Sequence, residues 1–322
     1  MPVQTQTETC FTLEAPQSAE WFDRIYTGDA RTAMRTLPAD SINLSFWSPP
    51  YFVGKEYEAH MTFPDWQKLI SGVIKEHTRV LKQGAFMVIN INDILCFTDP
   101  DMPRYMADNI SNKKVAITRE DILDTKEKYP NATRYDLARL LKCSEQTIQR
   151  RLEHNNVRGG KHAAGTKVFI VGGLLQQWAE EAGLFLYDRR IWHKDPCWAN
   201  SRWHSNSYRA VDEFEYLYVF WKPGIVEIDR DRLAPEEWAL WGSRAVWQIR
   251  SVARNARHEC EFPEMLAERV IRLYSDEGDV VLDPFVGSGT TTAAAKKLRR
   301  KYVGIDRLAK YTELAERRTN GI

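Results

Sequence analysis

The sequence Ser48-Pro49-Pro50-Tyr51 places a hydroxyl group, a proline turn and an aromatic ring directly after a short apolar stretch. Prolines lack an N–H group, so the turn presents carbonyl and side-chain oxygens that accept hydrogen bonds. An aromatic amine is a poor nucleophile because its lone pair is delocalised into the ring. If the Ser48 hydroxyl and the Pro49 carbonyl accept its two protons, the lone pair becomes localised on nitrogen, while Tyr51 offers a stacking face. By itself, a Pro-Pro-Tyr segment is more often an ordinary polar turn with a buried tyrosine.

A second group of residues has the composition of a ligand-binding turn. The apolar residues 279–282 predict a strand, which leads into the run Asp283-Pro284-Phe285-Val286-Gly287-Ser288-Gly289-Thr290 and a helix expected over 287–298. The glycines allow a tight bend and a close approach to a ligand, and a helix N-terminus offers unpaired N–H groups. A further strand, 301–306, ends on Asp306, which can accept hydrogen bonds from two ribose hydroxyls. The glycine turn alone would equally suit NAD or FAD, or no ligand at all.

Taken together and in this order, the two motifs resemble those of the DNA amino-methyltransferases, which modify adenine N6 or cytosine N4. The catalytic motif of that family is Asp/Asn/Ser-Pro-Pro-Tyr/Phe/Trp, and its cofactor motif contains Phe-x-Gly-x-Gly. The catalytic motif comes first here, as in the permuted beta group of the family. Three shorter segments also resemble family segments: 25–29 near the cofactor adenine, 190–194 beside the base pocket, and 258–263 over the methionine end of the cofactor.

The resemblance implies a permuted, Rossmann-like α/β fold that binds S-adenosyl-L-methionine and methylates a base flipped out of double-stranded DNA. It assigns catalysis to the four residues Ser48 to Tyr51. It assigns cofactor binding to Asp29, Phe262, Asp283, Pro284, Phe285, Gly287, Gly289, Thr290 and Asp306. No metal is required. Serine at the first motif position goes mostly with cytosine N4 in this family, so we expect N4-methylcytosine, with adenine N6 as the alternative. Family habit also suggests a restriction–modification setting, with an endonuclease of the same specificity as a partner.

Three other functions fit the same residues less well. Cytosine C5 methylation needs a cysteine nucleophile, but Pro196-Cys197 lies in an aromatic loop and the cofactor motif is not at the N-terminus. A nicotinamide dehydrogenase would leave the segment from Ser48 to Tyr51 unexplained. A non-catalytic DNA-binding regulator would not need Ser48, Tyr51, Asp283 and Asp306.

The amino-acid composition excludes several classes of protein. The chain has 322 residues, of which 43% are hydrophobic, and a net charge of only +1. No apolar run is long enough to span a bilayer, and residues 1–19 lack the order of a signal peptide. Its five cysteines have no zinc-knuckle or redox spacing, which indicates free thiols in a reducing compartment. We therefore expect a soluble intracellular protein. The family resemblance implies the cytoplasm of a prokaryotic cell, in association with DNA. Some beta-group enzymes are dimers, and the sequence does not indicate whether this protein is a monomer or a dimer.

Strands alternating with helices predict a mostly parallel sheet in a methyltransferase domain made of residues 20–98 and 167–320. Within the second part, a helix is expected over 167–183 and a strand over 185–194. The alternation stops over 99–165, where residues 104–161 hold 13 Lys or Arg and 8 Asp or Glu. We interpret 99–165 as a helical insertion.

The insertion contains a pattern that resembles a helix-turn-helix. Two helices are expected over 134–141 and 145–152, with Ser144 capping the second. That second helix would present Gln146, Thr147, Gln149 and Arg150 outward, and such side chains read base edges in the major groove. The alternative is a solvated helical hairpin that contacts no DNA.

A second candidate for target recognition is the segment 198–257. It lacks a regular period and is rich in arginines, among them Arg202 and Arg254. Loops of this composition suit a DNA surface, although ordinary solvated arginines would have the same composition.

Overall fold

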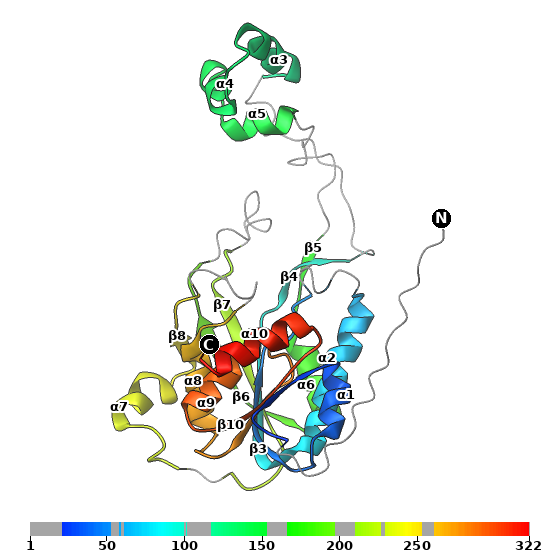
Figure 1. Cartoon of the computed structure of the whole chain (residues 1–322), viewed down its shortest axis with the longest axis vertical. Coiled ribbons are helices and arrows are strands. Elements are labelled where there is room, and N and C mark those ends of the chain that lie inside the picture. The colour runs from blue at the N-terminus through cyan, green and yellow to red at the C-terminus, as the bar shows by residue number, and fades with distance from the viewer. Residues whose placement is uncertain are drawn as a thin grey trace. The chain divides into compact units, whose positions relative to one another are not determined.

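The computed structural model describes residues 21–52, 58, 61–99, 101, 117–152, 166–196, 210–226, 229–252 and 261–321 (Figure 1). The chain divides into two compact units, one made of residues 1–94 and 169–322, the other of residues 95–168.

None of the described helices is both long enough and apolar enough to cross a membrane.

The larger unit is built on an eight-stranded sheet with the order β1-β10-β9-β2-β3-β7-β6-β8. In chain order these strands are β1 (Arg24–Thr27), β2 (Ile42–Trp47), β3 (Leu81–Ile91), β6 (Phe185–His193), β7 (Phe214–Trp221), β8 (Val246–Gln248), β9 (Val280–Asp283) and β10 (Lys301–Asp306). The pairs from β1 through β3 are parallel, and β7 is antiparallel to both β3 and β6. All strands of this sheet except β7 therefore end at the same edge.

Helices form two groups on either side of this sheet, as Figure 1 shows. One group contains α1 (Ala30–Thr36), α2 (Phe63–Val80) and α6 (Gly172–Glu181); the other contains α8 (Glu264–Tyr274), α9 (Thr290–Lys297) and α10 (Ala309–Thr319). The central strands are apolar along nearly their whole length, and every residue of β9 is buried. Such runs are typical of parallel strands covered on both faces. The mostly parallel α/β sheet expected from the sequence is therefore present.

Local signals explain where the helices begin. Thr62 caps α2, and its side chain and that of Asp65 exchange hydrogen bonds with each other's backbone N–H groups in a capping box. Pro64 lies in the first turn, where its missing N–H group costs nothing. In α8 the buried residues Leu266, Val270 and Ile271 recur at helical spacing and pack into the main core.

One expectation about local structure was wrong. The helix expected over 167–183 begins only at Gly172, because Thr166–Phe169 forms strand β5, which pairs with β4 (Ile94–Thr98) in a separate two-stranded sheet. Val168 and Phe169 favour the extended conformation over a helix. The segment 225–255, which has no sequence period, contains the short helix α7 (Pro235–Glu237), a π-helix (Trp238–Gly242) and β8.

The smaller unit contains the helices α3 (Arg119–Lys128), α4 (Arg134–Leu140) and α5 (Glu145–Leu152). They enclose a small core formed by Ile122, Leu137, Ala138 and Ile148. Capping boxes begin α3 and α4, and the Ser144 hydroxyl accepts a hydrogen bond from the Thr147 backbone N–H at 3.2 Å. A helical pair joined by a short turn therefore exists where the sequence indicated one.

The backbone of Gly84, in β3, lies close to the backbone of Ile225, and this contact leads to a testable prediction about stability. Gly84 has a φ of +81°, and a Cβ there would lie 2.2 Å from the Ile225 carbonyl oxygen. Gly183 has a φ of +80° with nothing within 4 Å of its Cβ position, so it is a matched control. Gly183→Ala should cost about 1 kcal/mol of unfolding free energy from the left-handed backbone alone.

We expect Gly84→Ala to cost at least twice as much, because the backbone of residue 225 must also move. Urea denaturation of the two variants beside the wild type measures this difference. Equal losses in the two variants would show that the contact between Gly84 and Ile225 is not a constraint.

Candidate active site

The pairing of β2 with β9 brings the two sequence motifs together. Ser45 lies opposite Leu282 in the parallel register, so both strands end within a few residues of each other at the same edge. Beyond those ends the ring of Trp47 lies 5.4 Å from the ring of Phe285. The serine-proline turn and the glycine turn therefore share the edge at which open α/β sheets bind ligands.

Asp283 is the buried acid of this edge. Its side chain is almost fully buried, and its Oδ1 accepts a hydrogen bond from the Phe285 backbone N–H at 3.0 Å. Burial disfavours the charged form and raises the pKa of Asp283 to about 7, and the charge of Asp306 acts in the same direction. A positively charged ligand group placed beside Asp283 would restore its charge.

Asp306 organises the glycine turn. Its Oδ2 accepts a hydrogen bond from the Gly287 backbone N–H at 3.1 Å, and its Oδ1 accepts one from the Leu308 backbone N–H at 2.9 Å. Gly289 precedes α9 with a φ of +81°, and a Cβ there would lie only 2.7 Å from the Ala315 Cα. Glycine is therefore required at this position by backbone conformation and by space.

The other expected cofactor residues lie around this turn. Pro284 lies within it. The Thr290 hydroxyl accepts a hydrogen bond from Arg318 at 2.8 Å. Phe262 packs against Phe46, with the ring centres 5.2 Å apart.

Asp29 follows β1 at the same edge, because Thr27 lies opposite Asp306. Its carboxylate caps α1 and binds the Arg31 guanidinium at 2.9 and 2.7 Å. Burial raises the pKa of Asp29, but the hydrogen bonds and charge of Arg31 outweigh it, and the pKa lies below its usual value.

These groups fit S-adenosyl-L-methionine. That cofactor carries a positively charged sulfonium and amino group, together with a ribose that donates two hydroxyl hydrogens. The buried carboxyl of Asp283 suits the cation, and Asp306 at the end of β10 suits the ribose. The Trp47 Nε1 atom is also buried beside Phe285, and no described residue accepts a hydrogen bond from it, so a polar ligand group could serve as its acceptor.

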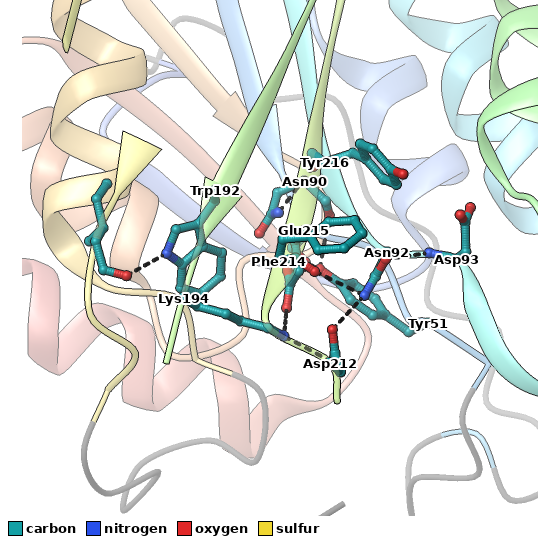
Figure 2. A network of polar contacts seen from close by, with 12 residues as sticks. Tyr51, Asn90, Asn92, Asp93, Trp192, Lys194, Asp212, Phe214, Glu215 and Tyr216 are labelled. Carbon is teal, nitrogen blue, oxygen red and sulfur yellow. Dashed lines mark hydrogen bonds and ion pairs between the residues drawn. The ribbon is translucent and has the colours of Figure 1, made fainter. Parts of the chain in front are cut away.

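A network of polar contacts surrounds the serine-proline turn (Figure 2). The Ser48 hydroxyl donates to the Tyr51 hydroxyl oxygen at 3.0 Å, and the Tyr51 hydroxyl in turn lies 2.7 Å from Glu215 Oε2. The Lys194 ammonium donates to Glu215 Oε1 at 2.7 Å and to Asp212 Oδ2 at 3.1 Å. Trp66 Nε1 donates to the Pro50 carbonyl at 2.7 Å, which fixes the end of the proline pair.

Two buried members of this network, Lys194 and Asp212, have shifted pKa values. Burial lowers the pKa of Lys194, but the charges of Glu215 and Asp212 outweigh it and keep that pKa well above its usual value. Burial raises the pKa of Asp212. Asn92 connects the end of β3 to the network, because its amide donates to Asp212 at 2.9 Å and to the Phe214 carbonyl at 3.0 Å.

Sequence reasoning did not single out Glu215, Asp212 or Asn92, and included Lys194 only within a segment beside the base pocket. Two signals could have found them. Asn92 follows the end of an otherwise apolar strand, and Glu215 is a buried acid near the start of another. Because β7 is antiparallel, its beginning lies at the same edge as the ends of its neighbours.

The expected DNA contacts lie mostly outside the described residues. Thr147 is in α5, and its hydroxyl contacts that of Ser144 at 2.9 Å. The backbones of Gln146, Gln149 and Arg150 belong to the same helix, but their side chains are outside the description. Arg202 and Arg254 lie entirely outside it, as do residues 258–260 of the segment 258–263.

Comparison with known proteins adds independent information. Residues 42–317 match the N6/N4 methyltransferase family, described as DNA methylase. The chain is 53% identical to the type II methyltransferase M.BglI of Bacillus subtilis over 91% of this chain and 84% of that protein.

Solved structures have the same fold. TTHA0409 of Thermus thermophilus, solved in complex with S-adenosyl-L-methionine, is 25% identical with a TM-score of 0.58, covering 93% of this chain and 95% of that one. The cytosine-N4-specific PvuII DNA methyltransferase is 17% identical with a TM-score of 0.57, covering 91% of this chain and 85% of that one.

The pKa of Asp283 predicts how cofactor binding depends on pH. A cationic ligand requires the ionised carboxylate, whose fraction falls about tenfold per pH unit below the pKa of about 7. The dissociation constant for S-adenosyl-L-methionine should therefore rise as pH falls from about 7 to about 5.5, and level off above about 8. Isothermal titration calorimetry across this range measures it.

Asp283→Asn should bind more weakly and lose this pH dependence, whereas Asp306→Asn should bind more weakly and retain it. A wild-type dissociation constant that stays constant across the same pH range would contradict the role given to Asp283.

Proposed function

The chain belongs to the N6/N4 DNA methylase family, and we propose that it methylates the N4 amino group of cytosine within a specific double-stranded DNA sequence. At the level of the family, it is a DNA amino-methyltransferase that uses S-adenosyl-L-methionine. The observation that carries the proposal is the parallel pairing of the two strands that precede Ser48 and the glycine turn, together with the 5.4 Å contact between the rings of Trp47 and Phe285.

Each half of the site has a separate task. When bound, S-adenosyl-L-methionine supplies a methyl carbon on a cationic sulfur, which keeps the bonding electron pair as the amine lone pair forms the new N–C bond. Asp283 and Asp306 hold the cofactor, and the turn at Gly287 and Gly289 lets the backbone approach it. The Ser48 hydroxyl oxygen and the Pro49 carbonyl accept the two amine protons and orient the lone pair. The methylated, cationic amino group then gives one of its two protons to solvent water, which leaves the base with a neutral N-methylamino group.

The base must leave the duplex stack to reach this edge, because its amino group is otherwise paired. Tyr51, half-buried at the end of the turn, supports the base with its ring while its hydroxyl is held by Glu215. Cytosine is favoured over adenine by Ser48, since serine at this motif position goes mostly with cytosine N4 in the family.

We further propose that different segments of the chain carry out catalysis and DNA recognition. Residues 20–98 and 167–320 carry the chemistry, and the helical insertion 99–165 and the segment 198–257 recognise the DNA sequence. The similarity to a type II methyltransferase supports a restriction–modification role, in which an endonuclease of the same specificity is the partner.

The modified base itself tests the proposed function. Genomic DNA from cells that express the protein should contain N4-methylcytosine, measured by mass spectrometry of nucleosides. Ser48→Ala should lower the level by about 100-fold or more, because one of two amine acceptors is lost. N6-methyladenine would keep the family reaction and contradict the choice of base. DNA without either base would contradict the proposed function.

DNA recognition by α5 has its own test. Gln146→Ala combined with Gln149→Ala should lower kcat/KM on the target sequence by about 10- to 100-fold per lost base contact. Lys126→Ala, on an exposed position of α3, is the control and should have little effect. Unchanged kcat/KM in the double variant would show that the helical unit does not read bases.

A further inference from the structure

The three side chains Ser48, Tyr51 and Glu215 form a hydrogen-bonded chain with a defined direction. Ser48 donates to the Tyr51 hydroxyl oxygen at 3.0 Å. Tyr51 has one hydroxyl hydrogen, and among its contacts with described residues the acceptors are Glu215 Oε2 at 2.7 Å and the Asn90 carbonyl at 3.2 Å. The carboxylate is the closer and the charged acceptor, so it takes the stronger bond.

The charge of Glu215 sets this direction. An ionised carboxylate can only accept hydrogen bonds, whereas each of the two hydroxyls can both donate and accept. Glu215 is largely buried, and the Lys194 ammonium binds its second oxygen at 2.7 Å. Because Glu215 accepts from Tyr51, the Tyr51 oxygen is left to accept from Ser48.

We propose that Glu215, held by Lys194, is a positioning residue that fixes the hydroxyl hydrogen of Ser48 away from the substrate, so that Ser48 acts as an acceptor for the amine. The inference rests on the proposed function and deepens it. A serine beside an amine could otherwise donate to the nitrogen lone pair, which would block its attack on the methyl group. An aspartate at this position would need no such control, because a carboxylate accepts in every orientation.

Glu215→Gln tests the inference. The amide retains size and shape but can donate to the Tyr51 oxygen and reverse the chain. We expect the single-turnover rate of methyl transfer to fall on the order of 10- to 100-fold, with binding of S-adenosyl-L-methionine nearly unchanged. The melting temperature should fall, because Lys194 loses one of its two buried carboxylate partners. Asp212→Asn is the matched control, since it removes the other carboxylate on Lys194 and keeps the contact between Tyr51 and Glu215. It should lower the rate less than Glu215→Gln does.

A double-variant cycle separates positioning from a general structural role. In a Ser48→Asp background, Glu215→Gln should change the rate by less than about threefold, because the acceptor no longer depends on the direction of the chain. The same large loss in both backgrounds would overturn the inference.

Tyr51→Phe provides a second variant should Glu215→Gln fail to fold. It keeps the ring and removes the middle hydroxyl, so it should lower the rate to a similar extent, and in a Ser48→Asp background its effect should again be small. A Tyr51→Phe rate equal to wild type would overturn the inference. Wild-type protein that methylates neither base would overturn the proposed function itself, whereas active wild type with fully active Glu215→Gln would overturn the positioning role alone.

Discussion

The parallel pairing of β2 with β9 is the constraint on which the site depends. The motifs that follow these strands are far apart in the sequence, yet the register of Ser45 against Leu282 makes them neighbours. Burial of both strands fixes that register, since a slip by one residue would turn every side chain to the other face. The ring contact between Trp47 and Phe285 continues the pairing beyond the strand ends.

The site contains two buried carboxyl groups whose surroundings differ, Asp283 at the glycine turn and Glu215 beside the serine-proline turn. The Asp283 carboxyl has no basic partner among the contacts that perturb it, so its raised pKa makes the folded state less stable as pH rises from about 4 to about 7. A cationic cofactor offsets that cost by binding. Glu215 instead has the Lys194 ammonium as a partner at 2.7 Å, so this buried carboxylate is paired within the chain itself.

The sequence alone was sufficient for the α/β class, the parallel sheet and the positions of the serine-proline turn and the glycine turn after their strands, because buried strands and glycine turns have local signals. It was insufficient for β5, since a strand of four residues cannot be distinguished from the start of the following helix by periodicity. It also missed Glu215 and Asp212, whose role depends on the antiparallel strand β7 beginning at the edge where β3 ends. A local pattern can mark Glu215 as an acid within an apolar strand, but only strand pairing shows which residues it meets.

The most direct test of the central claim is a crystal structure of the protein with target DNA and a non-reactive analogue of S-adenosyl-L-methionine. The quantity to measure is the distance from the exocyclic nitrogen of the flipped base to the Ser48 Oγ and Pro49 carbonyl oxygens. A flipped cytosine whose N4 lies about 3 Å from both oxygens is the predicted result. A flipped base whose amine lies beyond hydrogen-bond distance of both oxygens would contradict the role of the serine-proline turn in methyl transfer.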